Sequence, residues 1–458
     1  MLKSRTNHFA ALVVLAGLLG GGGIAYGLSN LVVQLAAIAL LALHRVEVGA
    51  FFAKAPRLLT ALVIASLALP LLQLVPLPPT MWKSLPGREL VQESLALGHV
   101  DGWFALSLNS ARTFVAFLGL IAPATVIIIG LGAERRAIDR ATLVWVGLGL
   151  LCVAIGGIEI LRPSGQSVLY PEGGMKGVLF GLLANRNSTG VFLVCCLLLL
   201  AAMPAAARMS GVWLIRACAA VLLAVGVVLT QSRTSMVLLG LPLGLMALRF
   251  LVDIARSRTS RTTRGTNAAS SVSGKFPLVA GLAIVLLAAA IGTAGIAPMT
   301  DNSRIGTSLS RFSNSDEQRP LIWEDARYAA QRYWWAGSGM GTFDEVFQVD
   351  EALEHISPRR AGRAHNDYLE VAIEAGIVGL GLIAAWIVWA LFASFRALRN
   401  PDPWPALSGL GILAVVALQS AFDYPLRNQT MLCMAAFAVL LLARGSAGAQ
   451  SGARGEVA

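Results

Sequence analysis

The chain has 458 residues, of which 56% are hydrophobic and only 13% are charged, and its formal net charge is +11 at neutral pH. Soluble domains carry about 25% charged residues, so this composition excludes an ordinary soluble globular protein. All five cysteines fall inside apolar runs: Cys152, Cys195, Cys196, Cys218 and Cys433. We expect them to be small core residues, which excludes a disulfide framework and a cysteine-based zinc site.

Apolar runs of about 18 to 22 residues recur from end to end, which is the length that a helix needs to cross a membrane. The first run is interpreted as a retained helix rather than a secretory signal, because it lacks a clean cleavage site and a second run follows at once. The sequence thus predicts an all-α polytopic membrane protein of about twelve helices. The predicted spans cover residues 9–25, 28–43, 58–76, 113–132, 142–160, 186–206, 211–230, 235–254, 277–297, 369–392, 405–421 and 427–443.

Basic residues set the predicted orientation, because short loops rich in Lys and Arg stay in the cytoplasm. Most basic clusters fall on one side of the predicted spans together with both termini, which we therefore place in the cytoplasm. The predicted divisions are as follows: residues 1–297 hold nine helices, an outer loop over 77–112 and a disordered basic cytoplasmic loop over 255–276; residues 298–368 form a large outer helical loop; residues 369–443 hold three helices; and residues 444–458 form a cytoplasmic tail.

Several arginines fall on the outer side, where topology does not require them. A guanidinium binds phosphate oxygens in pairs and keeps its charge, so such a cluster suits an anionic ligand. The alternative is pairing with acids of the outer loop, such as Glu324 and Asp325. The outer arginines include Arg186, Arg233, Arg304, Arg311, Arg319, Arg327, Arg332, Arg359, Arg360, Arg363 and Arg427.

The outer loop begins its regular structure with an amphipathic helix predicted over 319–334, with Pro320 in its first turn. A glycine-rich segment over 336–343 follows. We expect a sharp backbone turn there rather than a nucleotide cradle, because no strand precedes the segment and no Lys-Ser/Thr pair follows it.

His365 lies where this loop enters the tenth predicted helix. Histidine titrates near neutrality, so it can accept a proton from a hydroxyl group. Asn366, Asp367 and Tyr368 are candidates to orient His365 or to hold a polar substrate. His355 lies nearby in the sequence, but two histidines without a paired cysteine make a poor zinc site, and we predict no metal.

Three other helix ends on the same face each carry an arginine. Arg186 stands between Asn185 and Asn187, and Arg233 and Arg427 follow short polar breaks between apolar runs. Each arginine could anchor its helix at the membrane interface or face an aqueous cavity and bind an anion. Their convergence on the face that carries His365 favours a shared anion site.

These motifs together resemble the bacterial O-antigen ligase and O-antigen polymerase superfamily of membrane glycosyltransferases. The resemblance rests on the order and spacing of Pro76 to Arg88, Asn185-Arg186-Asn187, Gln231-Ser232-Arg233, Arg319 with Trp323, Gly337 to Phe343, His365 to Leu369 and Asp423 to Leu426. It implies a membrane glycosyltransferase fold of the C type in the bacterial inner membrane, with its active site at the periplasmic face. It also implies transfer of a glycan from undecaprenyl pyrophosphate to a sugar hydroxyl, without a metal or another cofactor.

The resemblance further implies the residue roles. His365 matches the histidine that activates the acceptor hydroxyl, and Arg233 and Arg319 match the arginines that hold the donor pyrophosphate. We add Arg186 and Arg427 as candidate pyrophosphate ligands from their position, and Asn185 and Asn187 as substrate-positioning residues.

The sequence leaves two enzymatic functions possible, together with one function of another class, transport. A polymerase, which we favour, uses a second lipid-linked repeat unit as acceptor, whereas a ligase uses lipid A-core. A transporter or flippase would place charged residues near the middle of the bilayer. Here the predicted spans are almost uncharged at their centres, which disfavours transport; nucleic acid is not an expected partner.

Overall fold

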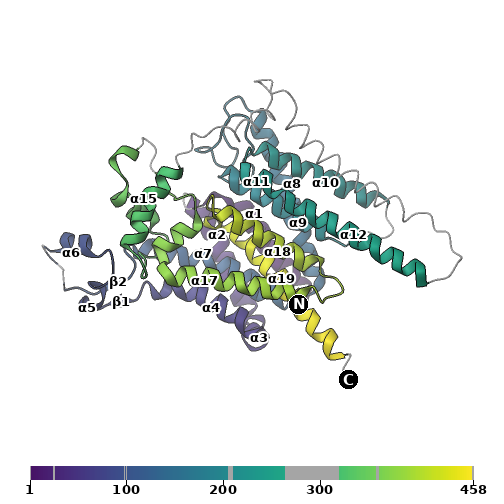
Figure 1. The fold of residues 1–458 in the computed structure, drawn as a ribbon, viewed down its shortest axis with the longest axis horizontal. Helices are drawn as coiled ribbons and strands as arrows, with labels where there is room; N and C mark the ends of the chain where they lie inside the picture. Colours follow the sequence, from purple (N-terminus) through teal and green to yellow (C-terminus); the bar gives the residue numbers. More distant parts are fainter. Residues whose placement is uncertain are drawn as a thin grey trace.

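The computed structural model describes residues 2–23, 26–96, 98, 101–204, 210–263, 319–356 and 361–455. Helices dominate these residues (Figure 1). The longer helices are α1 (Leu2–Leu19), α2 (Gly27–Leu43), α3 (Arg45–Lys54), α4 (Arg57–Leu72), α7 (Ser110–Leu131), α8 (Arg135–Leu161), α9 (Arg186–Ala202), α10 (Ser210–Leu229), α12 (Gly240–Thr263), α15 (Arg319–Arg332), α17 (Asp367–Ala397), α18 (Trp404–Ser420) and α19 (Gln429–Gly455). The short elements are η1 (Gly20–Gly22), α5 (Pro79–Trp82), α6 (Glu89–Leu95), α11 (Arg233–Leu238), α16 (Phe343–Asp350), η3 (Leu353–His355), η4 (Pro425–Arg427) and the strands β1 (Pro76–Leu77) and β2 (Phe104–Ala105).

Helices occupy the predicted apolar ranges, except for 277–297, which lies outside the described residues. Within the described residues, six helices are long and apolar enough to cross a membrane, or up to seven if α2 and α3, which bend by 79°, form one broken span. Three shorter apolar helices, α4, α9 and α18, accompany them. An all-α polytopic membrane fold is confirmed, whereas the count of twelve spans stays a prediction.

Two helices extend past the predicted divisions. Helix α12 continues to Thr263, into the first part of the predicted basic loop over 255–276. Helix α19 continues to Gly455, within the predicted tail over 444–458. The divisions themselves stay predictions. The remainder of the loop over 255–276 lies outside the described residues, as do residues 298–318 of the outer loop.

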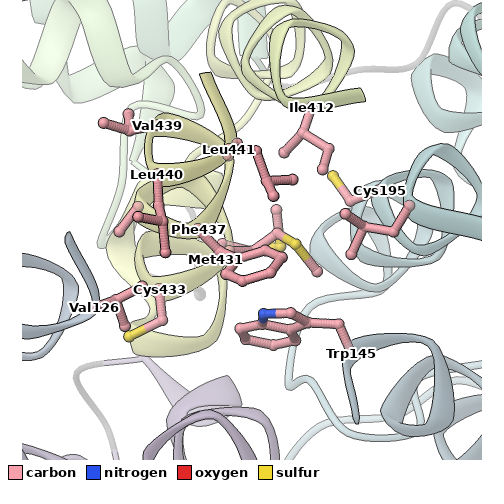
Figure 2. Close-up of a cluster of buried hydrophobic side chains, with 14 of the residues drawn as sticks. Val126, Trp145, Cys195, Ile412, Met431, Cys433, Phe437, Val439, Leu440 and Leu441 are labelled. Carbon is pink, nitrogen blue, oxygen red and sulfur yellow. The ribbon is translucent and has the colours of Figure 1, made fainter. Parts of the chain in front are cut away.

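The core lies among α7, α8, α9, α18 and α19. Helix α9 is buried on all sides over most of its length, as expected for an apolar helix in the centre of a bundle. Trp145 packs edge-on against Phe192 with ring centroids 6.0 Å apart, and the close-up in Figure 2 shows Trp145 facing side chains of α19. Four cysteines are buried as expected, but Cys218 is exposed because α10 lies at the outside of the bundle.

The outer elements gather beyond one end of the bundle, where Figure 1 shows α5, α6, β1 and β2 near α15. Strands β1 and β2 pair antiparallel, with Pro76 opposite Ala105. Helix α15 begins at Arg319 with Pro320 in its first turn, as predicted. Its buried Ala326 and Ala329 pack in a second apolar cluster that includes Phe343 and Phe347 of α16. The outer loop therefore has a small core of its own, which rests on α17.

Helix α17 is sharply kinked. Gly376 adopts φ 56° in the middle of the helix, so the continuous run of hydrogen bonds is broken there. A Cβ at Gly376 would lie 2.2 Å from the carbonyl oxygen of Trp335, a distance that real Cβ atoms do not show. The kink therefore requires glycine and separates a short outer segment of α17, which starts beside His365, from a long apolar segment.

The glycine-rich turn caps that outer segment. The N–H groups of Ser338 and Gly339 donate to the carbonyls of Ile373 and Glu374, each at 2.9 Å. The Gln73 amide also donates to the Glu374 carbonyl at 2.9 Å. The N–H groups of the turn thus donate to helix carbonyls that the kink leaves without a partner in the helix. These hydrogen bonds hold the outer segment of α17 in place.

Candidate functional site

His365 lies at the start of α17 in an uncommon backbone conformation. Its φ is 51°, in the left-handed region that side chains other than glycine seldom adopt. Asn366 is the N-cap of α17, and its Oδ1 accepts hydrogen bonds from the N–H groups of Tyr368 at 3.0 Å and Leu369 at 3.1 Å. The cap fixes the direction in which the chain enters the helix and so fixes the position of His365.

The imidazole of His365 is held by a carboxylate. Its Nδ1 lies 3.1 Å from Oδ1 of Asp423, and its ring packs against Tyr424 with centroids 5.0 Å apart. An ionised carboxylate only accepts hydrogen bonds, so Nδ1 donates and Nε2 is the nitrogen that can take a proton. The His365 side chain is 32% exposed and that of Asp423 only 1%. The proton-accepting group is therefore accessible, whereas its partner is shielded.

Positive and polar groups surround the Asp423 carboxylate. Burial raises its pKa, but the hydrogen bond and charge of His365, the charge of Arg319 and a hydrogen bond from Asn187 outweigh burial, so the pKa lies below its ordinary value of 3.8. The Asn185 amide nitrogen lies 3.4 Å from Oδ2. Asp423 is therefore ionised at neutral pH and stabilises a positive charge on the imidazole.

Arg319 reaches this pair from the outer loop. It is the first residue of α15, and its Nη1 donates to the Phe422 carbonyl at 2.7 Å, next to Asp423. The contact joins the start of α15 to the turn between α18 and α19. A guanidinium, an imidazole and a carboxylate from three separate segments thus come together.

Arg186 and Arg233 begin two neighbouring helices beside this group. Arg186 starts α9, where Asn185 Oδ1 accepts from the Asn187 N–H at 2.8 Å as the N-cap. Arg233 starts α11, and the Ser235 hydroxyl in its first turn donates to the Asn187 carbonyl at 3.4 Å. Both arginines are partly buried, and the asparagines beside Arg186 are the ones that contact Asp423.

Arg427 is a different case. Its guanidinium makes three contacts with carboxylates of α17: Nε lies 3.4 Å from Asp367, Nη2 lies 3.0 Å from Glu370, and Nη1 donates to Glu374 at 2.8 Å. The three carboxylates are at most 4% exposed. These three ion pairs favour a structural role for Arg427. Its binding of pyrophosphate stays a prediction.

Two neighbours of His365 also have structural roles. The Asp367 carboxylate accepts hydrogen bonds from the Ser420 hydroxyl at 2.9 Å and the Leu426 N–H at 3.3 Å. The Tyr368 hydroxyl donates to the Ala417 carbonyl at 2.8 Å. These polar atoms fasten α17 to α18 and to the turn that follows α18. Both residues were predicted to orient His365 or to hold a polar substrate, and that role stays a prediction.

The remaining outer arginines divide into three groups. Arg332 pairs with Asp350 of the outer loop at 2.6 Å, and Arg363 pairs with Glu370 of α17 at 3.0 Å. Arg327 is exposed on α15. Arg304, Arg311, Arg359 and Arg360 lie outside the described residues.

The second outer histidine does not join the site. His355 Nδ1 lies 2.8 Å from Asp325 Oδ2, whereas His365 contacts Asp423. Over the parts of the chain that the structure describes, no three His, Cys, Asp or Glu side chains lie together as metal ligands would.

Asp423 is the residue to which sequence reasoning assigned no role. It stands in a short polar break between two apolar runs on the membrane face that carries His365. A carboxylate at such a place could have been proposed as the histidine's partner from topology alone. What the sequence could not supply is the contact itself, because it depends on how α17, α18 and α19 pack.

A comparison with protein families reports one match. The sequence model of the family described as O-antigen ligase matches residues 218–384. Residues 218–384 of this chain are therefore similar to the O-antigen ligase family. No curated protein matches the chain.

The matched region joins the family to the site described above. It begins within α10, ends within α17 and contains Arg233, Arg319 and His365, whereas Asp423 and the Asn185 and Asn187 pair lie outside it. The match to the O-antigen ligase family supports glycosyl transfer of the ligase or polymerase type and, with the apolar helices, a multi-pass bacterial membrane protein.

Proposed function

We propose that the chain transfers a glycan from undecaprenyl pyrophosphate to a sugar hydroxyl at the periplasmic face, with His365 as the base. The observation that carries the proposal is the bond between His365 Nδ1 and the buried Asp423 carboxylate, which leaves Nε2 on an accessible side chain. An imidazole aligned by a second group suits the activation of a hydroxyl nucleophile.

In this reaction the acceptor oxygen bonds to the anomeric carbon of the donor while the bond from that carbon to pyrophosphate breaks. Nε2 of His365 takes the hydroxyl proton, and the pyrophosphate leaves with the electron pair. Asp423 stabilises the imidazolium that forms. Arg319, with Arg233 and Arg186 at neighbouring helix starts, would hold the pyrophosphate and stabilise its growing charge, so that the mechanism needs no metal.

We favour polymerisation of lipid-linked repeat units as the reaction. The reason is that the segment from Pro76 to Arg88 and the Asn-Arg-Asn group look more like those of polymerases. Transfer of the glycan to lipid A-core is the second candidate, and the match to an O-antigen ligase family supports it. Transport is less well supported, because the site groups gather at helix ends rather than within apolar spans.

Deletion of the gene separates the two candidates. Loss of a polymerase leaves a single repeat unit on the lipid A-core, whereas loss of a ligase leaves unmodified core and lipid-linked polymer, and gel electrophoresis of the polysaccharide distinguishes these products. Complementation with His365→Ala should fail, although the variant inserts in the membrane at the normal level. Full complementation by His365→Ala would refute the assignment of the base.

A further inference from the structure

A cavity of about 890 Å³ lies at the end of the bundle opposite His365. Asn400 and Asp402, which follow the last turn of α17, line it, whereas His365 precedes the first turn of the same helix. The cavity also touches α3 at Lys54 and α8 at Arg135. It is therefore separated from the proposed transfer site by the length of α17.

The cavity has a positively charged lining. Five basic side chains and three acidic ones take part, which gives a net charge of +2. The basic residues are Arg5, Lys54, Arg135, Arg216 and Arg444, and the acidic residues are Glu47, Asp139 and Asp402. Arg5 pairs with Glu47 at 3.5 Å and Arg135 with Asp402 at 3.0 Å, and Arg216 and Arg444 donate to backbone carbonyls. The lining keeps its net charge of +2 after these pairs, and this charge favours an anionic ligand.

Two buried donors in the lining lack partners. The Ser408 side chain is fully buried, and its hydroxyl has no hydrogen-bond partner among the described residues. The same holds for Nε of Arg5 within that part of the chain. An unpaired buried polar atom costs about 1 to 3 kcal/mol, so these atoms indicate that a polar ligand fills the cavity.

The walls of the cavity are apolar and reach the outer surface of the bundle. Phe51, Ile138 and Leu441 line the interior. Leu143 also lines the cavity and is 60% exposed on α8, one of the candidate membrane spans. A ligand whose charged group lies among the arginines can therefore extend an apolar chain past Leu143 toward the surrounding bilayer.

We propose that this cavity binds the phosphate headgroup of an anionic phospholipid, with one acyl chain leaving past Leu143. Basic pockets between helix ends recognise anionic headgroups by charge, and guanidiniums bind phosphate oxygens in pairs. Ser408 and Arg5 Nε donate to the headgroup oxygens. The inference does not depend on the reaction proposed for His365.

The test measures the melting temperature of the full-length protein in detergent during titration with phosphatidylglycerol, phosphatidylcholine or sn-glycerol 1-phosphate. Phosphatidylglycerol should raise the melting temperature to a plateau, and the other two compounds should not. In Lys54→Gln/Arg135→Gln, half-maximal stabilisation should need about thirtyfold more phosphatidylglycerol, at roughly five- to sixfold for each basic group lost.

Matched variants separate the cavity from surface charge. Arg57→Gln/Arg136→Gln removes the same charge from neighbouring positions that do not line the cavity, and it should leave the titration unchanged within about twofold. Ser408→Ala should raise the melting temperature without lipid, because it removes an unpaired hydroxyl, yet weaken the response to phosphatidylglycerol. Equal losses in the two double variants, or equal stabilisation by phosphatidylcholine, would overturn the proposal. Stabilisation by sn-glycerol 1-phosphate at similar concentrations would show that the cavity binds a free phosphate ester, and it would overturn the proposal that the ligand is a lipid.

Discussion

Asp423→Asn tests whether the carboxylate beneath His365 takes part in transfer. Asparagine keeps the size of the side chain and an oxygen that can accept from Nδ1, so the 3.1 Å contact with His365 can persist. What the change removes is the negative charge opposite the imidazolium that forms during the reaction. Hydrogen bonds to charged groups contribute about 1.5 to 3 kcal/mol and neutral ones about 1 kcal/mol.

The difference, about 0.5 to 2 kcal/mol, corresponds to a roughly two- to thirtyfold lower rate of transfer. Removal of the base itself in His365→Ala should cost about 10²- to 10⁴-fold. The assay follows polymer or ligated product formed from purified lipid-linked donor by each variant at equal protein concentration. Asp101→Asn is the control, because it neutralises a carboxylate of the outer loop that is 96% exposed.

Asp423→Asn should also change how the stability of the folded protein depends on pH. Because the pKa of Asp423 is lower in the folded protein, the carboxylate stabilises the fold above its ordinary pKa of 3.8, and this contribution is lost as pH falls through the lower folded value. Wild type should therefore exceed Asp423→Asn in stability at pH 6 and approach it in strong acid. A wild-type rate in Asp423→Asn, with an unchanged stability difference across this range, would refute the role given to the carboxylate.

Three further predictions concern the scaffold. Arg427→Met should lower the free energy of unfolding by about 3 to 5 kcal/mol, because it leaves buried Asp367 and Glu374 without their cation and Glu370 with Arg363 alone. Arg319→Gln should instead abolish transfer with little change in melting temperature. Gly376→Ala should destabilise by at least about 1 to 3 kcal/mol, whereas Gly381→Ala, in the same helix and without a close neighbour, should be neutral or stabilising. The hydrogen bond and charge of Asp325 raise the pKa of His355, so its stabilisation is full below its ordinary pKa of 6.5 and lost as pH rises through the higher folded value; melting curves of wild type and His355→Gln should differ at pH 6 and converge at pH 9.

The sequence was most informative where one physical signal dominates. Apolar length located the helices, and Pro320 together with the polar pattern after it located the start of α15. The role of the glycine-rich segment was only half foreseen. A sharp turn was expected, but the turn also caps a kink at Gly376, which no local pattern announces because the kink arises where two distant segments meet.

The site residues show the same division. The sequence singled out His365 and Arg319 by their residue type and position at helix ends. It could not distinguish Arg427, which forms ion pairs with Asp367, Glu370 and Glu374, from an arginine that faces a ligand, because pairing depends on tertiary contacts. The acids that neutralise Arg427 recur along one face of α17, and that spacing was the available signal.

The buried cluster around Arg427 explains how the site keeps its geometry. Asp367 and Glu370 follow His365 within the first turn of α17, and Arg427 follows Asp423 within one short turn. Each contact between these acids and Arg427 therefore fixes the distance from His365 to Asp423 through only a few residues. Buried ion pairs often add little net stability compared with apolar packing. In this protein the ion pairs instead fix how α17 aligns with the turn before α19. Apolar side chains could pack well in several alignments of these two segments, whereas three carboxylates around one guanidinium allow a single alignment.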